Sequence, residues 1–206
     1  MIKEENKKIN VDHLVLEVTR QCNMRCAHCL RGDAQCVDMP NKIIDKVLDS
    51  VSEIYSVTFT GGEPSLNIDA IRYFFRRSEE LGKLPMSFYI ATNGKENQEE
   101  LAIELLKWYP KMEEKESCGA SISVDRYHEA DATDPDSDIL RGLVFYRDDK
   151  ETNWDQYRLL YEGKAKNLEN VRFQDWEEDA SFYVELDDDA SSLTIEELYV
   201  AANGSH

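Results

Sequence analysis

The sequence predicts an α/β protein: a partial (β/α)6-type TIM barrel with parallel strands, followed by a short C-terminal β-hairpin extension. Two observations carry this prediction. Short β-branched and apolar segments alternate with longer segments whose apolar residues recur at helical spacing, and this alternation runs from residue 13 to residue 125. Strand-helix-strand units of this kind cross over with one hand, which places their strands in parallel and curls the sheet toward a barrel.

The repeating units place their boundaries at recognisable residues. Pro40 begins the first helix, Asn67 caps the second, and the third helix ends before Pro110. The strands of these units are expected at residues 13–19, 56–60, 86–92 and 119–124.

Beyond residue 125 the pattern weakens. It predicts helices at 138–148 and 153–162 and a short strand at 170–173. Apolar and polar residues then alternate from 180 to 186, and a turn-like stretch leads into 195–202, which predicts the β-hairpin.

The length of 206 residues suits one domain with a small appendage. We therefore divide the chain into an N-terminal extension (1–12), a core (13–173) and an acidic C-terminal extension (174–206).

The charge is strongly acidic and unevenly distributed. The formal net charge is −18, and residues 174–206 contain ten acidic residues and no Lys or Arg. Such a field repels phosphate backbones and anionic membrane surfaces, so nucleic acid and membrane are excluded as expected partners, whereas a basic peptide would be attracted. The N-terminus lacks an apolar leader and no stretch reaches the length of a membrane span, so we expect a cytoplasmic protein with reduced thiols.

Three cysteines are clustered as Cys22-x3-Cys26-x2-Cys29 at the end of the first expected strand. Three thiolates can hold three corners of a cubane 4Fe-4S cluster and leave the fourth iron open. The alternative is a structural zinc site with Cys36 as fourth ligand. A disulfide framework is disfavoured because the chain has five cysteines, an odd number, and no export signal.

Candidate binding residues follow each of the four expected strands, where parallel barrels collect their active sites. The first strand is followed by the cysteine loop and the second by residues 61–64 (Gly-Gly-Glu-Pro). The third strand ends at Asn93-Gly94, and the fourth presents Ser121, Ser123 and Asp125.

These residues resemble the radical S-adenosylmethionine (radical SAM) superfamily over about residues 13–125. Residues 22–29 match the family's C-x3-C-x-aromatic-C loop, with His28 in the aromatic position, and residues 61–64 match its glycine-rich motif. The resemblance implies a 4Fe-4S cluster on Cys22, Cys26 and Cys29, with S-adenosylmethionine chelating the open iron. It also implies reductive cleavage to a 5′-deoxyadenosyl radical that abstracts hydrogen from a substrate, an external flavodoxin-type or ferredoxin-type electron donor, and oxygen sensitivity.

The resemblance further implies roles for the residues at the strand ends. Backbone at Gly61 and Gly62 would approach the methionyl group, His28 would lie near the adenine, and Ser123 and Asp125 would hold the ribose. Glu63 is either an acceptor for the ammonium or a carboxylate that stabilises a helix N-terminus, and Asn93 is either a cofactor contact or a turn residue. The candidate cofactor-binding residues are therefore His28, Gly61, Gly62, Glu63, Asn93, Ser123 and Asp125.

The substrate is expected to be a peptide or protein. Residues 123–129 (Ser-Val-Asp-Arg-Tyr-His-Glu) and, more weakly, 163–167 (Gly-Lys-Ala-Lys-Asn) are similar to peptide-modifying and sulfatase-maturing branches of the family. No catalytic residue is assigned, and a role for His128 stays open. Larger members of those branches carry auxiliary clusters, whereas this chain has only Cys36 and Cys118 to spare. The alternatives are a glycyl-radical-enzyme activase and a non-catalytic iron-sulfur or zinc binding module.

Overall fold

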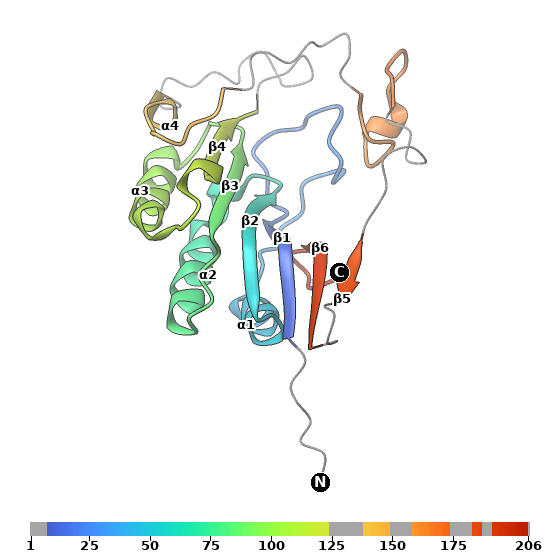
Figure 1. Ribbon diagram of the computed structural model, residues 1–206. Coiled ribbons are helices and arrows are strands. Elements are labelled where there is room, and N and C mark those ends of the chain that lie inside the picture. Colours follow the sequence, from blue (N-terminus) through green and yellow to red (C-terminus); the bar gives the residue numbers. More distant parts are fainter. Residues whose placement is uncertain (1–7, 124–137, 149–157, 174–182, 187–190, 206) are drawn as a thin grey trace.

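The computed structural model describes residues 8–123, 138–148, 158–173, 183–186 and 191–205, and these residues are arranged around one open sheet (Figure 1). The strand order is β4-β3-β2-β1-β6-β5. All neighbouring strands are parallel except the antiparallel pair β5 and β6. The strands are β1 (Lys8–Thr19), β2 (Glu53–Gly61), β3 (Ser87–Thr92), β4 (Gly119–Ile122), β5 (Val184–Leu186) and β6 (Ser192–Val200). The predicted α/β fold with an incompletely closed parallel sheet is confirmed.

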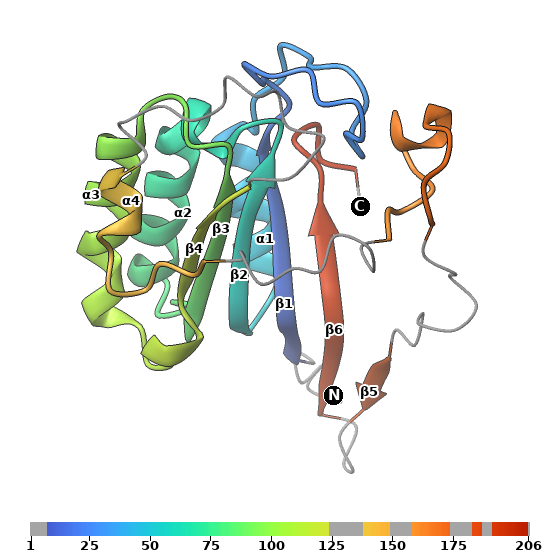
Figure 2. The same cartoon turned by 90° about the horizontal axis from the view of Figure 1, so that it is seen from above.

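Three long helices cover one face of this sheet (Figure 2). They are α1 (Asn41–Ser50), α2 (Ile68–Glu80) and α3 (Gln98–Trp108). The shorter elements are α4 (Asp138–Arg141) and the 3-10 helices η1 (Pro64–Asn67), η2 (Tyr109–Lys111), η3 (Lys115–Ser117) and η7 (Ala165–Asn167). No helix in the described part of the chain is both long enough and apolar enough to cross a bilayer.

Alternation along the strands decides which side chains form the core. Leu16 of β1 pairs with Phe59 of β2, which pairs with Ile90 of β3, and all three are fully buried. Phe59 makes edge-to-face contacts with Phe74 and Phe75 of α2, with ring centroids 5.5 and 5.3 Å apart. Burial of each such side chain stabilises the fold by roughly 1.5–3 kcal/mol. The hydrophobic core on the helix-covered face therefore holds the carboxyl ends of β1, β2 and β3 in place.

The opposite face of the sheet carries hydrogen-bonded polar side chains. His13 Nε2 lies 2.8 Å from Thr58 Oγ1, and Tyr89 Oη lies 2.6 Å from Ser121 Oγ. Ser121, one of the strand-end candidates, is thus paired within the sheet and is 2% exposed.

The C-terminal strand β6 lies beside β1 within the main sheet. Their parallel register runs from the pair Lys8 and Ser192 to the pair Leu16 and Val200. This partner explains why β1 begins at Lys8, five residues before the expected start. β5 and β6 form the predicted antiparallel hairpin, whereas the proposed boundary between a core and a C-terminal extension at residue 174 stays a prediction.

Two expected helices are wrong where the structure describes them. In the segment 138–148 only one helical turn forms, and the chain then runs along the edge of β4, where Ala120 N donates to Phe145 O (3.1 Å) and Arg147 N donates to Ala120 O (2.9 Å). An edge strand offers unpaired backbone groups, and pairing with them outweighs the local helical spacing. At 158–162, Leu159 instead bridges to Phe173, which lies in the short strand predicted at 170–173.

Candidate cofactor site at the carboxyl ends of the strands

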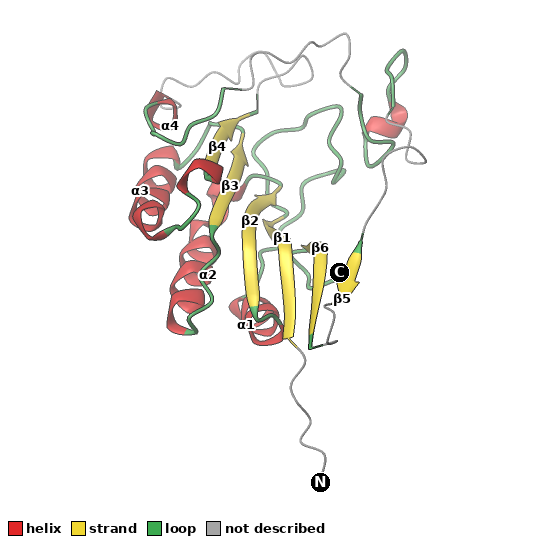
Figure 3. Cartoon of the chain, in the orientation of Figure 1, coloured by secondary structure: helices red, strands yellow, loops and turns green. Residues whose placement is uncertain are grey.

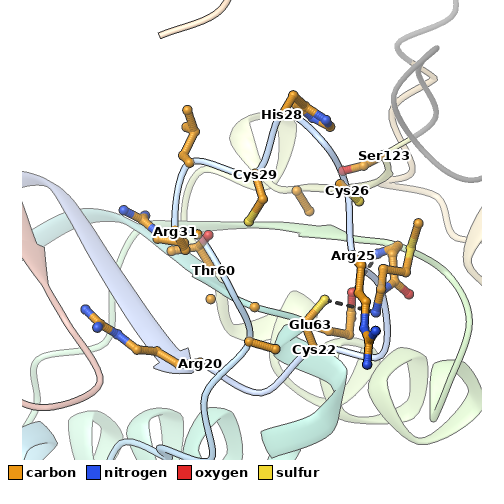
Figure 4. A pocket seen from close by; sticks show the side chains of 18 of the residues that line it. Arg20, Cys22, Arg25, Cys26, His28, Cys29, Arg31, Thr60, Glu63 and Ser123 are labelled. Atoms are coloured by element: carbon orange, nitrogen blue, oxygen red, sulfur yellow. Dashed lines mark hydrogen bonds between the residues drawn. The ribbon is translucent and has the colours of Figure 1, made fainter. Parts of the chain in front are cut away.

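A cavity of about 490 Å³ lies where β1, β2, β3 and β4 end (Figure 4). Its walls come from the loop after β1, residues 60–64, residues 91–93, Ser123 and residues 158–160. Figure 3 shows the long loop after β1 arching over this end of the sheet. The volume lies in the range of small-molecule and cofactor sites, roughly 300–1,000 Å³. The strand ends thus converge on one space, as predicted.

All three clustered cysteines line this cavity. Cys22, Cys26 and Cys29 are each partly buried, and Figure 4 shows their sulfurs around the interior of the loop. Within the described residues, no three His, Cys, Asp or Glu side chains converge tightly enough to hold a single metal ion. The thiols instead surround a shared space, which suits a cluster whose corners each take one thiolate.

Local hydrogen bonds fix the shape of the cysteine loop, residues 20–37. Met24 N donates to Cys22 Sγ (3.4 Å), and Cys29 N donates to Cys26 O (3.3 Å). Burial raises the pKa of the Cys22 thiol. Cys36 is exposed and is not among the lining residues, and Cys118 is buried at the start of β4.

The neck of this loop is closed by backbone pairing. Arg20 N donates to Val37 O (2.7 Å), and Gln35 N donates to Arg20 O (2.9 Å). Thr19, the last residue of β1, donates its hydroxyl to Asp38 Oδ1 (2.6 Å) and accepts from Gln21 N (3.0 Å). A polar residue at the end of the strand therefore turns the chain into the loop.

The two glycines after β2 make room for the backbone of the cysteine loop. A Cβ at Gly61 would lie 2.2 Å from Thr19 O, and a Cβ at Gly62 would lie 2.2 Å from Gln21 O. Gly62 N also donates to Thr19 O (2.8 Å). Close approach was the predicted reason for these glycines, and the structure identifies protein backbone as one partner. Both residues also line the cavity, so contact with a cofactor stays a prediction.

Glu63 is a buried carboxylate, 1% exposed, that joins the ends of β2 and β3. Its Oε1 accepts from Thr92 Oγ1 (2.6 Å) and Ser65 N (3.1 Å), and its Oε2 accepts from Asn93 N (2.7 Å). Burial raises its pKa, although these hydrogen bonds act in the opposite direction. The contact with Ser65 N caps η1, which agrees with the helix-terminal interpretation of this residue.

Asn93 connects the end of β3 to the cysteine loop. Its Nδ2 donates to Asn23 Oδ1 (2.6 Å), while its Oδ1 accepts from Lys95 N (3.0 Å) in a turn. Both interactions are within the protein, and they hold the loop segment between Cys22 and Cys26 against the sheet.

The other predicted residues are only partly placed. His28 and Ser123 line the cavity, and Figure 4 shows His28 at the crest of the loop above Ser123. Ser123 N donates to Thr92 O (2.8 Å), which continues the β3 and β4 pairing into the site. Asp125, Tyr127 and His128 lie outside the described residues.

The segment 163–164, which the sequence indicated only through a weak family similarity, packs directly on the cysteine loop. Gly163 has φ +50°, and a Cβ there would lie 2.4 Å from Cys29 O. Lys164 N donates to Cys29 O (2.9 Å), and Lys164 Nζ lies 2.7 Å from Asp33 Oδ1. The Lys164 ammonium lowers the pKa of Asp33.

The sequence analysis missed a buried carboxylate beneath the loop that pairs with two arginines. Glu17 of β1 pairs with Arg20 and Arg31, and both arginines line the cavity. The available signal was an acidic residue inside an apolar strand, because a carboxylate with no exposure needs partners.

Sequence comparison finds a family match that contains the cysteine and glycine motifs. Residues 16–112 match the model of the Radical SAM superfamily. An uncharacterized protein of Methanocaldococcus jannaschii is 36% identical over 62 residues, which are 29% of this chain and 22% of that protein. The GTP 3′,8-cyclase of Clostridium acetobutylicum is 36% identical over 93 residues, which are 41% of this chain and 28% of that protein. The chain thus matches about a quarter of the length of each curated relative.

Comparison of structures finds distant neighbours that this chain covers in part. SuiB of Streptococcus suis bound to S-adenosylmethionine has a TM-score of 0.38 at 19% identity, covering 55% of this chain and 25% of SuiB. The enzyme anSMEcpe with bound AdoMet and Cp18Cys peptide has a TM-score of 0.38 at 18% identity, covering 65% and 38%. SuiB bound to its precursor peptide SuiA has a TM-score of 0.36 at 22% identity, covering 60% and 26%. By this family match and the paired cysteine and glycine motifs that it contains, the segment 16–112 of this chain is a Radical SAM superfamily domain.

Proposed function

We propose that this chain is a radical SAM enzyme that binds a 4Fe-4S cluster through Cys22, Cys26 and Cys29 and binds S-adenosylmethionine in the adjoining cavity. The observation that carries the proposal is that the three thiols line one cavity together with the ends of β2, β3 and β4. When bound, the cluster supplies the electron that cleaves S-adenosylmethionine to a 5′-deoxyadenosyl radical for hydrogen abstraction from a substrate.

The residues of the chain divide into those that would touch the cofactor and those that shape its site. The backbone at Gly61 and Gly62, the ring of His28 and the hydroxyl of Ser123 border the cavity and would contact S-adenosylmethionine. Both oxygens of Glu63 already accept hydrogen bonds from protein donors. We therefore assign Glu63 to hold the ends of β2 and β3 at a fixed separation.

Anaerobic reconstitution tests the proposal directly. The chain is incubated with iron and sulfide, then with dithionite and S-adenosylmethionine, and 5′-deoxyadenosine is measured by chromatography. Cys22→Ala, Cys26→Ala and Cys29→Ala are expected to lose cluster absorbance and product. Cys36→Ala is the matched control, because Cys36 lies on the same loop but is exposed and outside the cavity lining.

Metal analysis of anaerobically purified chain separates the enzyme from a binding module. About four irons per chain supports the enzyme, because a cubane cluster holds four. About one zinc per chain without iron, or no 5′-deoxyadenosine from a fully reconstituted chain, would overturn the proposal.

A peptide or protein is the substrate class that we propose. The net charge of −18 supports it, because an acidic exterior attracts a basic chain. The partner that supplies electrons would be a flavodoxin-type or ferredoxin-type protein, and both would meet this chain in the cytoplasm, where thiols stay reduced. A short precursor peptide encoded beside this chain would support the peptide substrate, whereas a large glycyl-radical enzyme encoded there would favour the activase.

A further inference from the structure

Glu17 is a carboxyl residue in the buried part of β1, and its two oxygens face different arginines. Its side chain has no exposed surface. Arg20 Nε lies 3.0 Å from Oε2, and Arg31 Nε lies 3.5 Å from Oε1. A buried carboxylate is retained at such a position only when positive groups and donors offset its loss of hydration. The two guanidinium groups provide that compensation.

The two arginines occupy equivalent places on either side of the cysteine triplet. Arg20 precedes Cys22 by two residues, and Arg31 follows Cys29 by two residues. Figure 4 shows both side chains on the β1 side of the cavity. One carboxylate therefore contacts both flanks of the segment that carries the three thiols.

Backbone bonds alone do not provide this connection. The bonds of Arg20 to Gln35 and Val37 close the neck of the loop. Arg31 lies farther along, on the arm that returns from Cys29, and its ion pair with Glu17 joins that arm to β1. The ion pairs of Glu17 with Arg20 and Arg31 thus restrain the spacing between the two ends of the cysteine triplet.

The same carboxylate also joins the loop to the C-terminal strand. Ala202 N, just after β6, donates to Glu17 Oε2 (2.9 Å). The guanidinium of Arg31 lies over the ring of Tyr199 on β6, 4.5 Å from its centroid. Burial raises the pKa of Tyr199 to about 12, so its phenol is neutral near the carboxylate.

We propose that Glu17 is a positioning residue for the cluster: by holding Arg20 and Arg31 it fixes the distance between the first and last thiol, and through Ala202 and Tyr199 it makes this distance depend on β6. The inference rests on the proposed function, since it assumes that the three thiols bind a cluster. Glu17 itself touches neither cluster nor substrate.

The test compares two buried glutamates. Glu17→Gln keeps the size of the side chain and removes its charge. Glu104→Gln on α3 is the matched control, because Glu104 is also buried and paired, with Arg72 Nε at 3.1 Å and Lys107 Nζ at 3.0 Å, but it is not among the residues that line the cavity. Both variants and the unaltered chain are reconstituted anaerobically, and the rate of iron loss to a chelator is measured beside the thermal unfolding midpoint.

Glu17→Gln is expected to lose iron about 10-fold faster than the unaltered chain, in the range seen when residues that orient metal ligands are changed. Glu104→Gln is expected to lower the unfolding midpoint without changing that rate. Equal rates of iron loss in the two variants, with a normal cluster in the unaltered chain, would overturn the role of Glu17 and leave the proposed function intact. Failure of the unaltered chain to bind iron would overturn the proposed function itself.

A second pair of variants addresses the case in which Glu17→Gln does not fold. Arg31 is half-exposed, so Arg31→Ala leaves the core unchanged and removes one of the two flanking contacts. Faster iron loss in Arg31→Ala, partly reversed in Arg31→Lys, supports the positioning role because lysine restores the charge but not the planar fork. Iron loss at the unaltered rate in Arg31→Ala would contradict it.

Discussion

Buried glutamates occur on the helix-covered side of the sheet and at the cavity, and their partners differ. Glu104 on α3 contacts the cations Arg72 and Lys107 and the indole N–H of Trp108 (2.9 Å). Glu63 at the cavity accepts only from neutral donors, namely Thr92, Ser65 and Asn93. Hydrogen bonds and these cations lower the pKa of Glu104 although burial opposes them, whereas burial raises the pKa of Glu63.

The difference separates two uses of a buried carboxylate. On the helical side the charge joins α2 to α3 and contributes to stability. At the cavity the carboxylate fixes backbone groups at the ends of two strands, at a cost in desolvation. The helical side is therefore expected to control stability, and the cavity edge to control the geometry of the site.

The largest expected effect on stability lies in the aromatic core of the helical side. Phe75 is fully buried, and its ring stacks on Trp108 with centroids 5.2 Å apart. Phe75→Ala should lower the free energy of unfolding by about 3–5 kcal/mol, because it leaves a cavity in a packed core. Urea denaturation measures this loss. A change below about 1 kcal/mol would show that this side does not dominate stability.

The second-largest effect is expected at the cavity edge, where a substitution should change both stability and iron binding. Gly62→Ala places a Cβ 2.2 Å from Gln21 O, so the cysteine loop must move. We expect a stability loss of about 1–3 kcal/mol, together with loss of iron binding after reconstitution. Gly142→Ala is the control, since the nearest atom to its Cβ would lie 3.4 Å away, at a site outside the cavity lining. Normal iron content in Gly62→Ala would contradict a role for this glycine in shaping the iron-binding site.

The two glutamates should also differ in their dependence on pH. The pKa of Glu104 is lowered on folding, so its stabilisation is present above the unfolded pKa of about 4.3 and is lost as pH falls through the folded value. The pKa of Glu63 is raised, so its contribution is greatest below the unfolded pKa and declines as pH rises through the folded value.

Urea unfolding across a pH series measures this difference. Glu104→Gln should remove part of the acid-induced loss of stability, and Glu63→Gln should remove part of the decline on the alkaline side of pH 4.3. Parallel pH profiles for the two variants would contradict the contrast.

The smallest effect on the free energy of unfolding is expected at the exposed surface of the helical side. Leu106 on α3 is 45% exposed, whereas its neighbour Leu105 is fully buried. Leu106→Gln should change the free energy of unfolding by less than about 0.5 kcal/mol, as is usual for surface substitutions. A loss comparable to that of Phe75→Ala would mean that Leu106 is covered by a partner.

The site was predictable from sequence where its signal is local. The spacing of Cys22, Cys26 and Cys29 and the glycine motif after β2 placed these groups at one edge of the sheet, and the structure brings them to one cavity. Their partners were not predictable. That Gly62 meets Gln21, and that Glu63 accepts from Thr92 and Asn93, depends on how three strand ends meet in space.

The fold shows the same limit. The alternating strands and helices up to residue 122 follow local periodicity, and they are confirmed. The pairing of β6 with β1 joins residues that are more than 180 positions apart, and nothing in the local pattern of 192–200 specifies that partner. Helical spacing in 138–148 was misleading because the open edge of β4 binds that segment through Ala120.

The contact between Ala202 and Glu17 has a consequence for the order of folding. β1 is synthesised early, yet its neighbour β6 and the N–H that Glu17 accepts emerge only after some 180 further residues. Pairings this distant form late, since the intervening chain must be ordered before they add stability. A nascent chain that stops short of residue 202 would expose all three thiols on an incompletely held loop. If the three thiols bind the proposed cluster, we expect its insertion to depend on completion of the sheet.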